Sequence, residues 1–479
     1  MRKLLLASAA TLSAAVGVTG IAAAQTQTVT TAPAAFPVGV MGVPAQPQPQ
    51  LGGNNRLNSD GAPPPANMVA PGSVTLHFNG RINWYGYVAG GSGYTNTVTV
   101  PNPNGPGTVS ATNKLNPYGT IGYMRLYPGM DGMATNGLRY GAIAEIRQNF
   151  GGVTTSASSG PNAASAASSG NTLYVRRAAV YMGSNTVGLV KIGLIDGPFS
   201  SWLGPTTTEG FNDGAWNGDL PGAIPSNVGV TWPFWDVGNE YDVNRIVYLS
   251  PSFWGFDASA SFAPSNYGFG GAANSGCAVA SGTCGAASSV ADFTLSGRPT
   301  NWYEAMLRYR GNFAGAGIYA IAGYSGSGTV NSSVGQGQLF NGLGVGTAGL
   351  ALTYAGFTLA GNVLWGAFNG SVQPKPQGGA NALAWVAGLQ YATGPIVVGA
   401  SWFNFQSQGA VSRVGLSQRN ENGLAVGATY TPAPGLDIYL SYLYGERTQG
   451  GYNFITATPG AANNAVHAQA FSLGGRVRW

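Results

Sequence analysis

The sequence predicts an all-β fold, a transmembrane antiparallel β-barrel of about 16 strands. Three observations favour it. Only 8% of the 479 residues carry a charged side chain, whereas about 25% do so in soluble domains. Runs of alternating apolar and polar residues recur along the chain, as expected for strands that face lipid on one side and water on the other. The connections between these runs are alternately short and long, which is typical of membrane-spanning barrels.

The N-terminus has the features of a secretory signal peptide. Arg2 and Lys3 precede the apolar run 4–21, and three alanines at 22–24 offer a cleavage site. We therefore expect residues 1–24 to be removed on export. An uncleaved anchor helix is the alternative, and the serines and threonines of the run argue against it. Loss of Arg2 and Lys3 lowers the formal net charge by two, from +5 to +3, which is too little to predict a nucleic-acid partner.

Residues 25–72 should form a Pro/Gln-rich flexible linker. Proline and glutamine dominate Pro44–Gln50, and three prolines follow at 63–65. This composition favours an extended chain without a packed core. A tether that faces peptidoglycan is the alternative. The barrel itself should occupy residues 73–479.

The clearest strand signal is the run 74–88. Val74, Leu76 and Phe78 alternate with Thr75 and His77, and the alternation continues far beyond the ~5–6 residues of a common soluble strand. After residue 24 no stretch reaches the roughly eighteen apolar residues that a spanning helix needs. A membrane-spanning chain of this kind must close into a barrel. The remaining strands are predicted at 118–127, 138–150, 173–183, 187–195, 244–250, 254–263, 301–311, 313–324, 345–355, 356–368, 382–392, 395–406, 422–431, 434–446 and 466–479.

The connections also fit a barrel. Short ones, such as Gly183–Thr186 and Thr431–Gly435, consist of turn-forming residues. The connection 128–137 is longer than this pattern favours, although it is rich in turn residues. The long connections fall at about 89–117, 151–172, 196–243, 264–300, 325–344, 369–381, 407–421 and 447–465.

The third long connection, residues 196–243, is the most distinctive segment of the chain. It is rich in both acidic and aromatic residues. Disordered segments are poor in aromatics, and long connections without secondary structure are often functional. We therefore expect a packed, functional loop. Its aromatics are Phe199, Trp202, Phe211, Trp216, Trp232, Phe234 and Trp235.

Two features lie outside this pattern of strands and loops. Cys277 and Cys284 are close in a Gly/Ala/Ser-rich stretch, and in an exported protein a local disulfide is the simplest prediction. Free thiols or an incomplete metal site are the alternatives. The last strand has one apolar face that ends in an aromatic residue, and this face is the candidate assembly signal: Phe471, Leu473, Val477 and Trp479.

A family resemblance rests on three segments. Tyr174–Pro198 resembles the fourth and fifth strands of the general bacterial porins and the start of their constriction loop. Asn244–Gly255 resembles the return from that loop, and Phe471–Trp479 resembles the closing strand. The resemblance covers residues 73–479. The sequence departs from the family pattern in its low charge and at Leu194, where many relatives carry a basic residue.

The resemblance implies an outer-membrane channel. It implies a sixteen-stranded barrel, usually a homotrimer, with the third loop folded inward to narrow a water-filled passage. Ions and small hydrophilic solutes would cross it by passive diffusion. The implied partners are outer-membrane lipid and the barrel assembly machinery, which would read the closing strand.

Charged residues of the loop and the wall are the candidate lining of the channel. Buried unpaired arginines facing lipid would cost roughly 2–4 kcal/mol each at the bilayer midplane, so most should face the lumen. The acidic side is predicted at Glu209, Asp213, Asp219 and Asp236, and Glu240 lies near the exit of the loop. The basic side is predicted at Arg81, Arg125, Arg139, Arg147, Arg176, Arg177 and Lys191.

Arg176 and Arg177 are neighbours, so a regular strand cannot turn both of them inward. Arg176 is the preferred inward residue, because Ala179 and Tyr181 suit the lipid face. Charges scattered over the wall without a collective role are the alternative to an organised lining.

Other functions have less support. The only histidines, His77 and His467, should lie roughly 20 Å or more apart on neighbouring strands. No phosphate loop, serine nucleophile motif or helical metal signature occurs, so we expect no enzyme and no cofactor. The alternatives to a general channel are a solute-selective channel for sugars or anions, in which loop aromatics could form a stacking track, and a non-conducting structural or adhesive barrel. An outer-membrane phospholipase is a weaker alternative.

Overall fold

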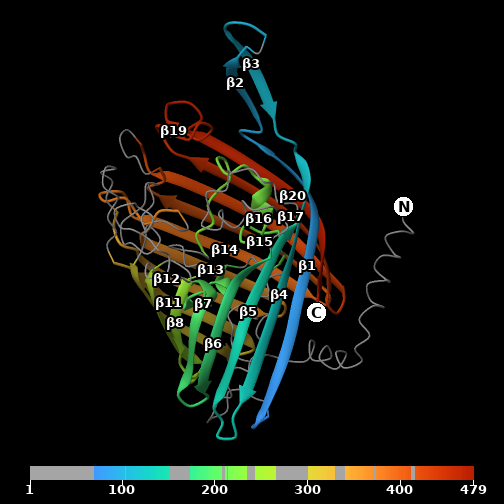
Figure 1. The fold of residues 1–479 in the computed structure, drawn as a ribbon, viewed down its shortest axis with the longest axis vertical. Coiled ribbons are helices and arrows are strands. Elements are labelled where there is room, and N and C mark those ends of the chain that lie inside the picture. Colours follow the sequence, from blue (N-terminus) through green and yellow to red (C-terminus); the bar gives the residue numbers. More distant parts are fainter. Residues whose placement is uncertain are drawn as a thin grey trace, which may run out of the picture.

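The computed structural model describes residues 70–102, 104–150, 173–207, 211–212, 214–234, 243–265, 300–328, 340–370, 374–410 and 416–479. Within them, sixteen antiparallel strands close into one barrel (Figure 1). The strands are β1 (Ser73–Gly91), β4 (Tyr118–Met133), β5 (Arg139–Phe150), β6 (Tyr174–Ser184), β7 (Gly188–Ile195), β8 (Val243–Leu249), β9 (Phe256–Ser265), β10 (Thr300–Phe313), β11 (Ala316–Gly326), β12 (Gly344–Tyr354), β13 (Phe357–Ala367), β14 (Ala382–Thr393), β15 (Ile396–Ser407), β16 (Arg419–Ala433), β17 (Leu436–Thr448) and β20 (Ala465–Arg478).

The predicted fold class is confirmed, because each predicted run overlaps one of these strands. Neighbours pair in chain order, and β1 pairs with β20 to close the barrel. The largest difference from the predicted boundaries is at the end of β4. β4 continues to Met133, so the connection to β5 is a tight turn in which Ala134 N–H donates to Leu138 O at 2.8 Å. The alternation of short and long connections therefore extends to this pair as well.

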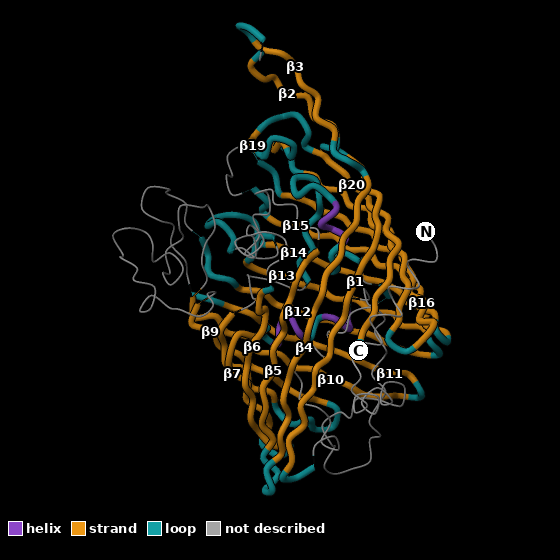
Figure 2. Tube along the Cα trace, turned by 45° about the vertical axis from the view of Figure 1, so that its right-hand side comes forward, coloured by secondary structure: helices purple, strands orange, loops and turns teal. Residues whose placement is uncertain are grey.

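The long connections contain further strands. β2 (Thr95–Pro101) and β3 (Thr108–Lys114) pair as a hairpin that projects beyond the barrel (Figures 1 and 2). β18 (Tyr452–Asn453) and β19 (Thr458–Pro459) form a second, shorter pair. Neither pair was predicted, because β2 and β3 have only seven residues each, most of them polar, and β18 and β19 have two residues each.

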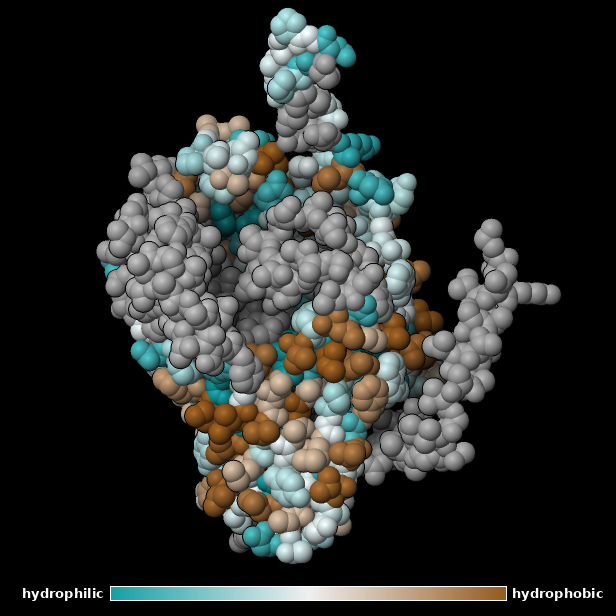
Figure 3. Space-filling model, in the orientation of Figure 1, coloured by the Kyte–Doolittle hydropathy of each residue, from teal (hydrophilic) through white to brown (hydrophobic). Residues whose placement is uncertain are grey.

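The two faces of the wall differ as the alternation predicts. On β1, Leu76 and Phe78 are exposed by 77% and 58%, whereas Asn83 and Tyr85 are buried. On β20, Phe471 and Leu473 are exposed and Ser472 is buried. Apolar side chains cover much of the outer wall in Figure 3. The exposed apolar face therefore surrounds the barrel, and the polar face lines its lumen.

Between β7 and β8 the chain turns into the lumen, where three helical turns lie inside the barrel (Figure 2). They are α4 (Pro198–Ser201), η1 (Gly204–Thr206) and η2 (Leu220–Ala223). We call the described part of residues 196–234 the lumen segment. No helix in the described ranges is long and apolar enough to cross a membrane.

Three predictions fall outside the described residues. The signal peptide 1–24 lies there entirely, the linker 25–72 nearly so, and so do Cys277 and Cys284. These remain sequence predictions.

Candidate functional site: the lumen segment and the charged wall

Buried ion pairs hold the start of the lumen segment. Asp196 accepts hydrogen bonds from Arg177 and, at 3.1 Å, from Arg176. Arg176 also donates to Glu145 on β5 at 2.9 Å. The point at which the chain leaves β7 is therefore tied to β5 and β6.

The next residues are held by β10, which lies three strands farther around the barrel from β7. The carboxylate of Glu304 pairs with Arg245 at 2.6 Å and accepts the Phe199 N–H at 3.2 Å. Gly197 passes so close to this pair that a Cβ at this position would collide with both side chains. The sharp inward turn thus depends on a glycine and on a fully buried ion pair.

From this root the lumen segment follows the inner wall in strand order. The Tyr319 hydroxyl on β11 donates to the Trp202 carbonyl at 2.8 Å. The Asn362 amide on β13 donates to the Thr206 hydroxyl at 2.9 Å. The segment is therefore bonded to the wall opposite its root.

Glycines of the wall then allow the backbone of the segment to come close. A Cβ at Gly399 would lie 2.5 Å from the Phe211 ring, and a Cβ at Gly427 would collide with Asn212. The Thr429 hydroxyl donates to the Phe211 carbonyl at 2.6 Å. Close approach at β15 and β16 therefore needs glycine at these wall positions.

The aromatics of the lumen segment are buried against the same wall. Trp216 and Trp232 pack edge-on against Phe403, with ring centroids 5.9 and 5.1 Å away. The Trp216 indole N–H donates to the Leu424 carbonyl at 3.1 Å. These rings fix the segment in place, so they are unsuited to form a stacking track for sugars.

The segment then crosses to the strands that close the barrel and turns back. The Tyr94 hydroxyl donates to the Ala223 carbonyl at 3.0 Å, and burial raises the pKa of Tyr94 to about 12, so it remains a donor at neutral pH. Arg447 donates to the carbonyls of Ser226 and Asn227 at 3.2 and 3.3 Å. The segment is thus bonded to the wall along its described length.

At this crossing one predicted acid meets one predicted base. The Asp219 carboxylate lies 3.6 Å from the Arg125 guanidinium, and the Asp219 side chain is 42% exposed. The two predicted sides therefore face each other at this point. The other predicted acids lie outside the described residues, namely Glu209, Asp213, Asp236 and Glu240.

Four arginines form a row across the wall that faces Asp219. Arg81 lies opposite Arg478 on one side and Arg125 on the other, and Arg125 lies opposite Arg147. Opposite residues have Cβ atoms about 4.5–5.5 Å apart, and like charges in such positions are destabilising. We call Arg478, Arg81, Arg125 and Arg147 the arginine row. Arg478 was not among the predicted basic residues. Only the pairing of β20 with β1 places it opposite Arg81.

The prediction that only one of Arg176 and Arg177 faces inward is wrong. Both contact Asp196. The pairing of β5 with β6 shifts register between Glu145 and its neighbour, and such a bulge places two consecutive residues on one face. The argument from Ala179 is wrong for the same reason, because Ala179 is buried inside whereas Val180 is exposed outside.

Other predicted bases lie on the lumen side but away from the arginine row. Arg139 and Lys191 are both buried. Arg139 precedes Arg147 by eight positions on β5, which corresponds to roughly 26 Å along the strand. The basic side is thus spread over the height of the barrel.

Wall carboxylates pair with many of the arginines, and most of these acids were not predicted as site residues. Asp257 contacts Arg308 at 2.5 Å, and Asp437 contacts Arg476 at 2.6 Å. The sequence offered one sign of their role, because these acids occupy the positions of the predicted strands that face the lumen. The full set of described wall acids in ion pairs is Asp131, Glu145, Asp257, Glu304, Glu421 and Asp437.

The two histidines are separate, as expected. His77 contacts Asp131 at 3.0 Å near the start of β1. His467 contacts Ser92 at 3.4 Å, just beyond the other end of that strand. They share no site.

Comparison with known families now identifies this barrel. Residues 5–450 match the family model described as Gram-negative porin. The chain belongs to this family. The porin is thus an outer-membrane channel, and family and fold both indicate a channel rather than an enzyme. The expected outer-membrane location is confirmed.

Solved structures of other porins and outer-membrane proteins align with this porin. An anion-selective porin from Comamonas acidovorans aligns with a TM-score of 0.50 and 12% identity over 85% of this chain and 100% of its own. Outer-membrane expressed OmpT of Vibrio cholerae aligns with a TM-score of 0.46 and 12% identity over 86% of this chain and 99% of its own. A mutant of Rh. blastica porin aligns with a TM-score of 0.44 and 12% identity over 85% of this chain and 100% of its own. No curated protein matches the sequence.

Proposed function

We propose that ions and small hydrophilic solutes cross the part of the lumen between the arginine row and the lumen segment. The observation that supports this is the ion pair of Arg125 in the row with Asp219 in the segment, 3.6 Å apart, which places charges of both signs at the edge of this passage. About sixteen strands leave an aqueous lumen, and a narrow part of such a lumen selects by its width and its charges. Diffusion through it needs no energy source.

We also propose that this passage prefers small anions. Adjacent registers bring four arginines together, which raises the local concentration of anions in a water-filled cleft. One solved structure that shares the fold is described as an anion-selective porin. At 12% identity this likeness concerns the fold, so the proposal depends on the arginine row of this chain.

Reversal potentials across a salt gradient test both proposals. Arg81→Ser combined with Arg125→Ser should lower the ratio of anion to cation permeability several-fold, because half of the row is neutralised. Asp219→Asn should change the ratio in the opposite direction. Arg139→Ser is the matched control, since this arginine faces the lumen outside the row. An unchanged ratio in the double variant would remove the row from the path of the solutes.

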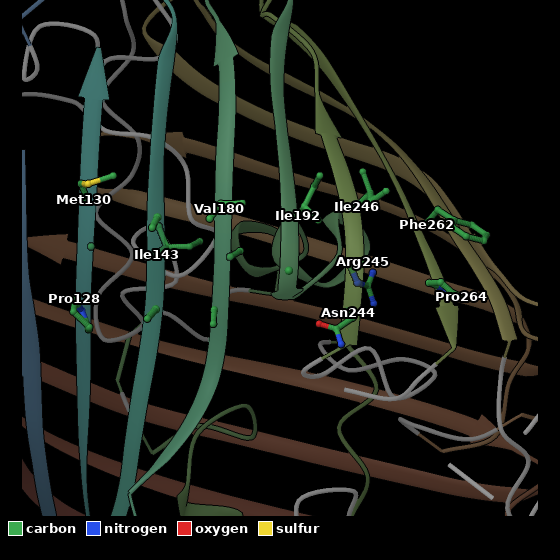
Figure 4. A pocket seen from close by; sticks show the side chains of 16 residues that line it. Pro128, Met130, Ile143, Val180, Ile192, Asn244, Arg245, Ile246, Phe262 and Pro264 are labelled. Atoms are coloured by element: carbon green, nitrogen blue, oxygen red, sulfur yellow. The ribbon is translucent and has the colours of Figure 1, made fainter. Parts of the chain in front are cut away.

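We propose a homotrimer as the assembly. A groove of about 910 Å³ runs along the outer wall from β4 to β9, with Ala144 and Ala178 in its lining. Larger apolar side chains border these alanines, among them Met130, Val180 and Phe262 (Figure 4). Such a recess on the lipid-facing wall can receive the side chains of a neighbouring copy.

The size of the porin in detergent, which distinguishes trimers from monomers, tests this proposal. Ala144→Trp should fill the groove and convert trimers into monomers, while the barrel stays folded. Ala387→Trp is the control, because it adds the same side chain to the outer face of β14. Trimers of the Ala144→Trp variant that match those of the parent would show that the copies meet elsewhere.

We propose that the barrel assembly machinery reads the outer face of β20. Phe471, Leu473, Val477 and Trp479 are all exposed on that face, so they remain accessible until the strand pairs in the membrane. We also propose that the porin has no catalytic activity.

A further inference from the structure

The outer wall changes from apolar to polar near the ends of β15, β16, β17 and β20 that lead into long connections. Asn404, Asn422, Glu446 and His467 lie directly opposite one another in successive strand pairs. Each lies within three residues of a strand end that leads into a long connection. Their chain neighbours, such as Phe403, are buried inside, so these four side chains face outward. We call them the polar row.

Mostly apolar side chains lie beneath the polar row, and Gln469, directly below His467, is the polar exception. Trp402 is one outward position below Asn404, and Phe471 is two outward positions below His467; both are exposed. The polar row therefore marks the height at which the hydrocarbon-facing wall ends. Long connections lie on the extracellular side of such barrels, so this height corresponds to the headgroups of the outer leaflet.

Polar groups of this surface have hydrogen-bonding capacity to spare. The Asn404 amide donates to Asn422 at 2.9 Å and to Asn420 at 2.7 Å. These bonds leave the side-chain N–H groups of Asn420 and Asn422 as donors. Among the described residues, none pairs with the Glu446 carboxylate. A ligand with several hydroxyl or amino groups would satisfy this mixture of donors and acceptors.

Aromatic rings lie beside and below the row. Trp385 on β14 lies opposite Asn404 and is 41% exposed. On β17 the Tyr444 ring, one outward position below Glu446, stacks on His467, with centroids 6.5 Å apart. Flat rings beside amides and a carboxylate provide both apolar faces and hydrogen bonds, which suits the alternating apolar and hydroxyl surfaces of a sugar.

Phosphate groups are a poorer match. The described arginines of β16, β17 and β20 occupy positions that face the lumen, as the buried Arg447 and Arg476 illustrate. Phosphate recognition favours arginine and lysine. The single charged group that points outward here is an acid, so a neutral or amino sugar fits better than a phosphate.

We propose that the polar row binds the sugar headgroup of an outer-leaflet glycolipid. The sugar would contact Asn422 and Glu446 at the rim, and the acyl chains would lie along the apolar wall below. This site is on the outside of the barrel, so it is independent of the proposed path of solutes through the lumen. It would hold the glycolipid against β15 to β20 after extraction from the membrane.

Glycolipid retention tests the proposal. The folded porin is extracted in mild detergent, and lipopolysaccharide bound per barrel is measured for the parent and for Asn422→Ala combined with Glu446→Ala. Loss of several hydrogen bonds of ordinary strength should lower retention about tenfold. Single-channel conductance should remain that of the parent, which also shows that the variant is folded. Glu446→Gln alone, the more conservative change, should lower retention to a smaller degree.

Two controls distinguish sugar contacts at the polar row from other causes of glycolipid retention. Gln148→Ala removes an outward amide at a similar height on β5, and it should retain as much glycolipid as the parent. Added chelator should leave retention unchanged if sugar contacts dominate. Parent-like retention in both polar-row variants would overturn the proposal. So would retention that is lost with chelator, since it would assign Glu446 to a cation that bridges phosphate.

Discussion

Replacing Glu304 by alanine should destabilise the barrel by about 3–5 kcal/mol, because truncation leaves the partner charge buried and unpaired. Arg245 and Glu304 are 1% and 0% exposed, and they lie 2.6 Å apart. The same change removes the acceptor for the Phe199 N–H at the start of α4. We therefore expect the root of the lumen segment to loosen and the single-channel conductance to become larger and noisier. Denaturant unfolding in vesicles and planar-bilayer recording measure the two effects.

Asp437→Ala is the matched control for this prediction. Asp437 is in an equally buried pair with Arg476 at 2.6 Å, but its partners, including Thr431, belong to the wall. It should lose comparable stability while the size of the conductance steps stays close to that of the parent. Glu304→Gln keeps an acceptor for Phe199 and should give the quieter channel of the two Glu304 variants. Equal step sizes in Glu304→Ala and the parent would show that this pair does not position the lumen segment.

Replacing Gly399 by valine should act in the opposite direction and narrow the passage. A Cβ at this position would lie 2.5 Å from the Phe211 ring, so the lumen segment must move away from β15 and toward the open side. Overpacking of this kind costs about 1–3 kcal/mol. We expect lower conductance and slower entry of larger solutes, measured by bilayer recording and by swelling of solute-loaded vesicles.

Gly317→Val provides the comparison for the Gly399 variant. Gly317 also faces the lumen, on β11, but a Cβ there would lie 3.7 Å from Thr353, an ordinary contact. The same added side chain should leave the conductance nearly unchanged. A fall of equal size in both variants would mean that bulk anywhere in the lumen lowers the conductance, and that close contact at Phe211 has no special role.

The strands of this porin were predictable because their signal is local. Lipid outside and water inside impose alternation on each strand separately, so Leu76 and Asn83 could be assigned to opposite faces from the chain alone. The same reasoning failed at Arg176 and Arg177. A single inserted residue reverses the faces of everything beyond it, and the bulge arises from pairing with β5, which the sequence of β6 does not display.

The lining of the lumen was predictable in kind but not in pairing. Inward arginines and an acid-bearing loop followed from alternation and from the cost of charges in lipid. Asp219 could be named from the loop, but its partner Arg125 depends on how far the segment travels around the wall. The wall acids Asp257 and Glu304 were not predicted as site residues, because their ion pairs lie across neighbouring strands and depend on register.

The amino-acid sequence by itself determined the export signal as an expectation, the number and approximate positions of the strands, and, on strands without a bulge, the side of the wall that a residue faces. These properties depend on short-range periodicity and on the solvent that each side chain meets. Only the tertiary structure decided which arginines form the row, where the lumen segment meets the wall, and which outward polar residues share one height. Those depend on the stagger of closed strands, and stagger is a property of the whole barrel.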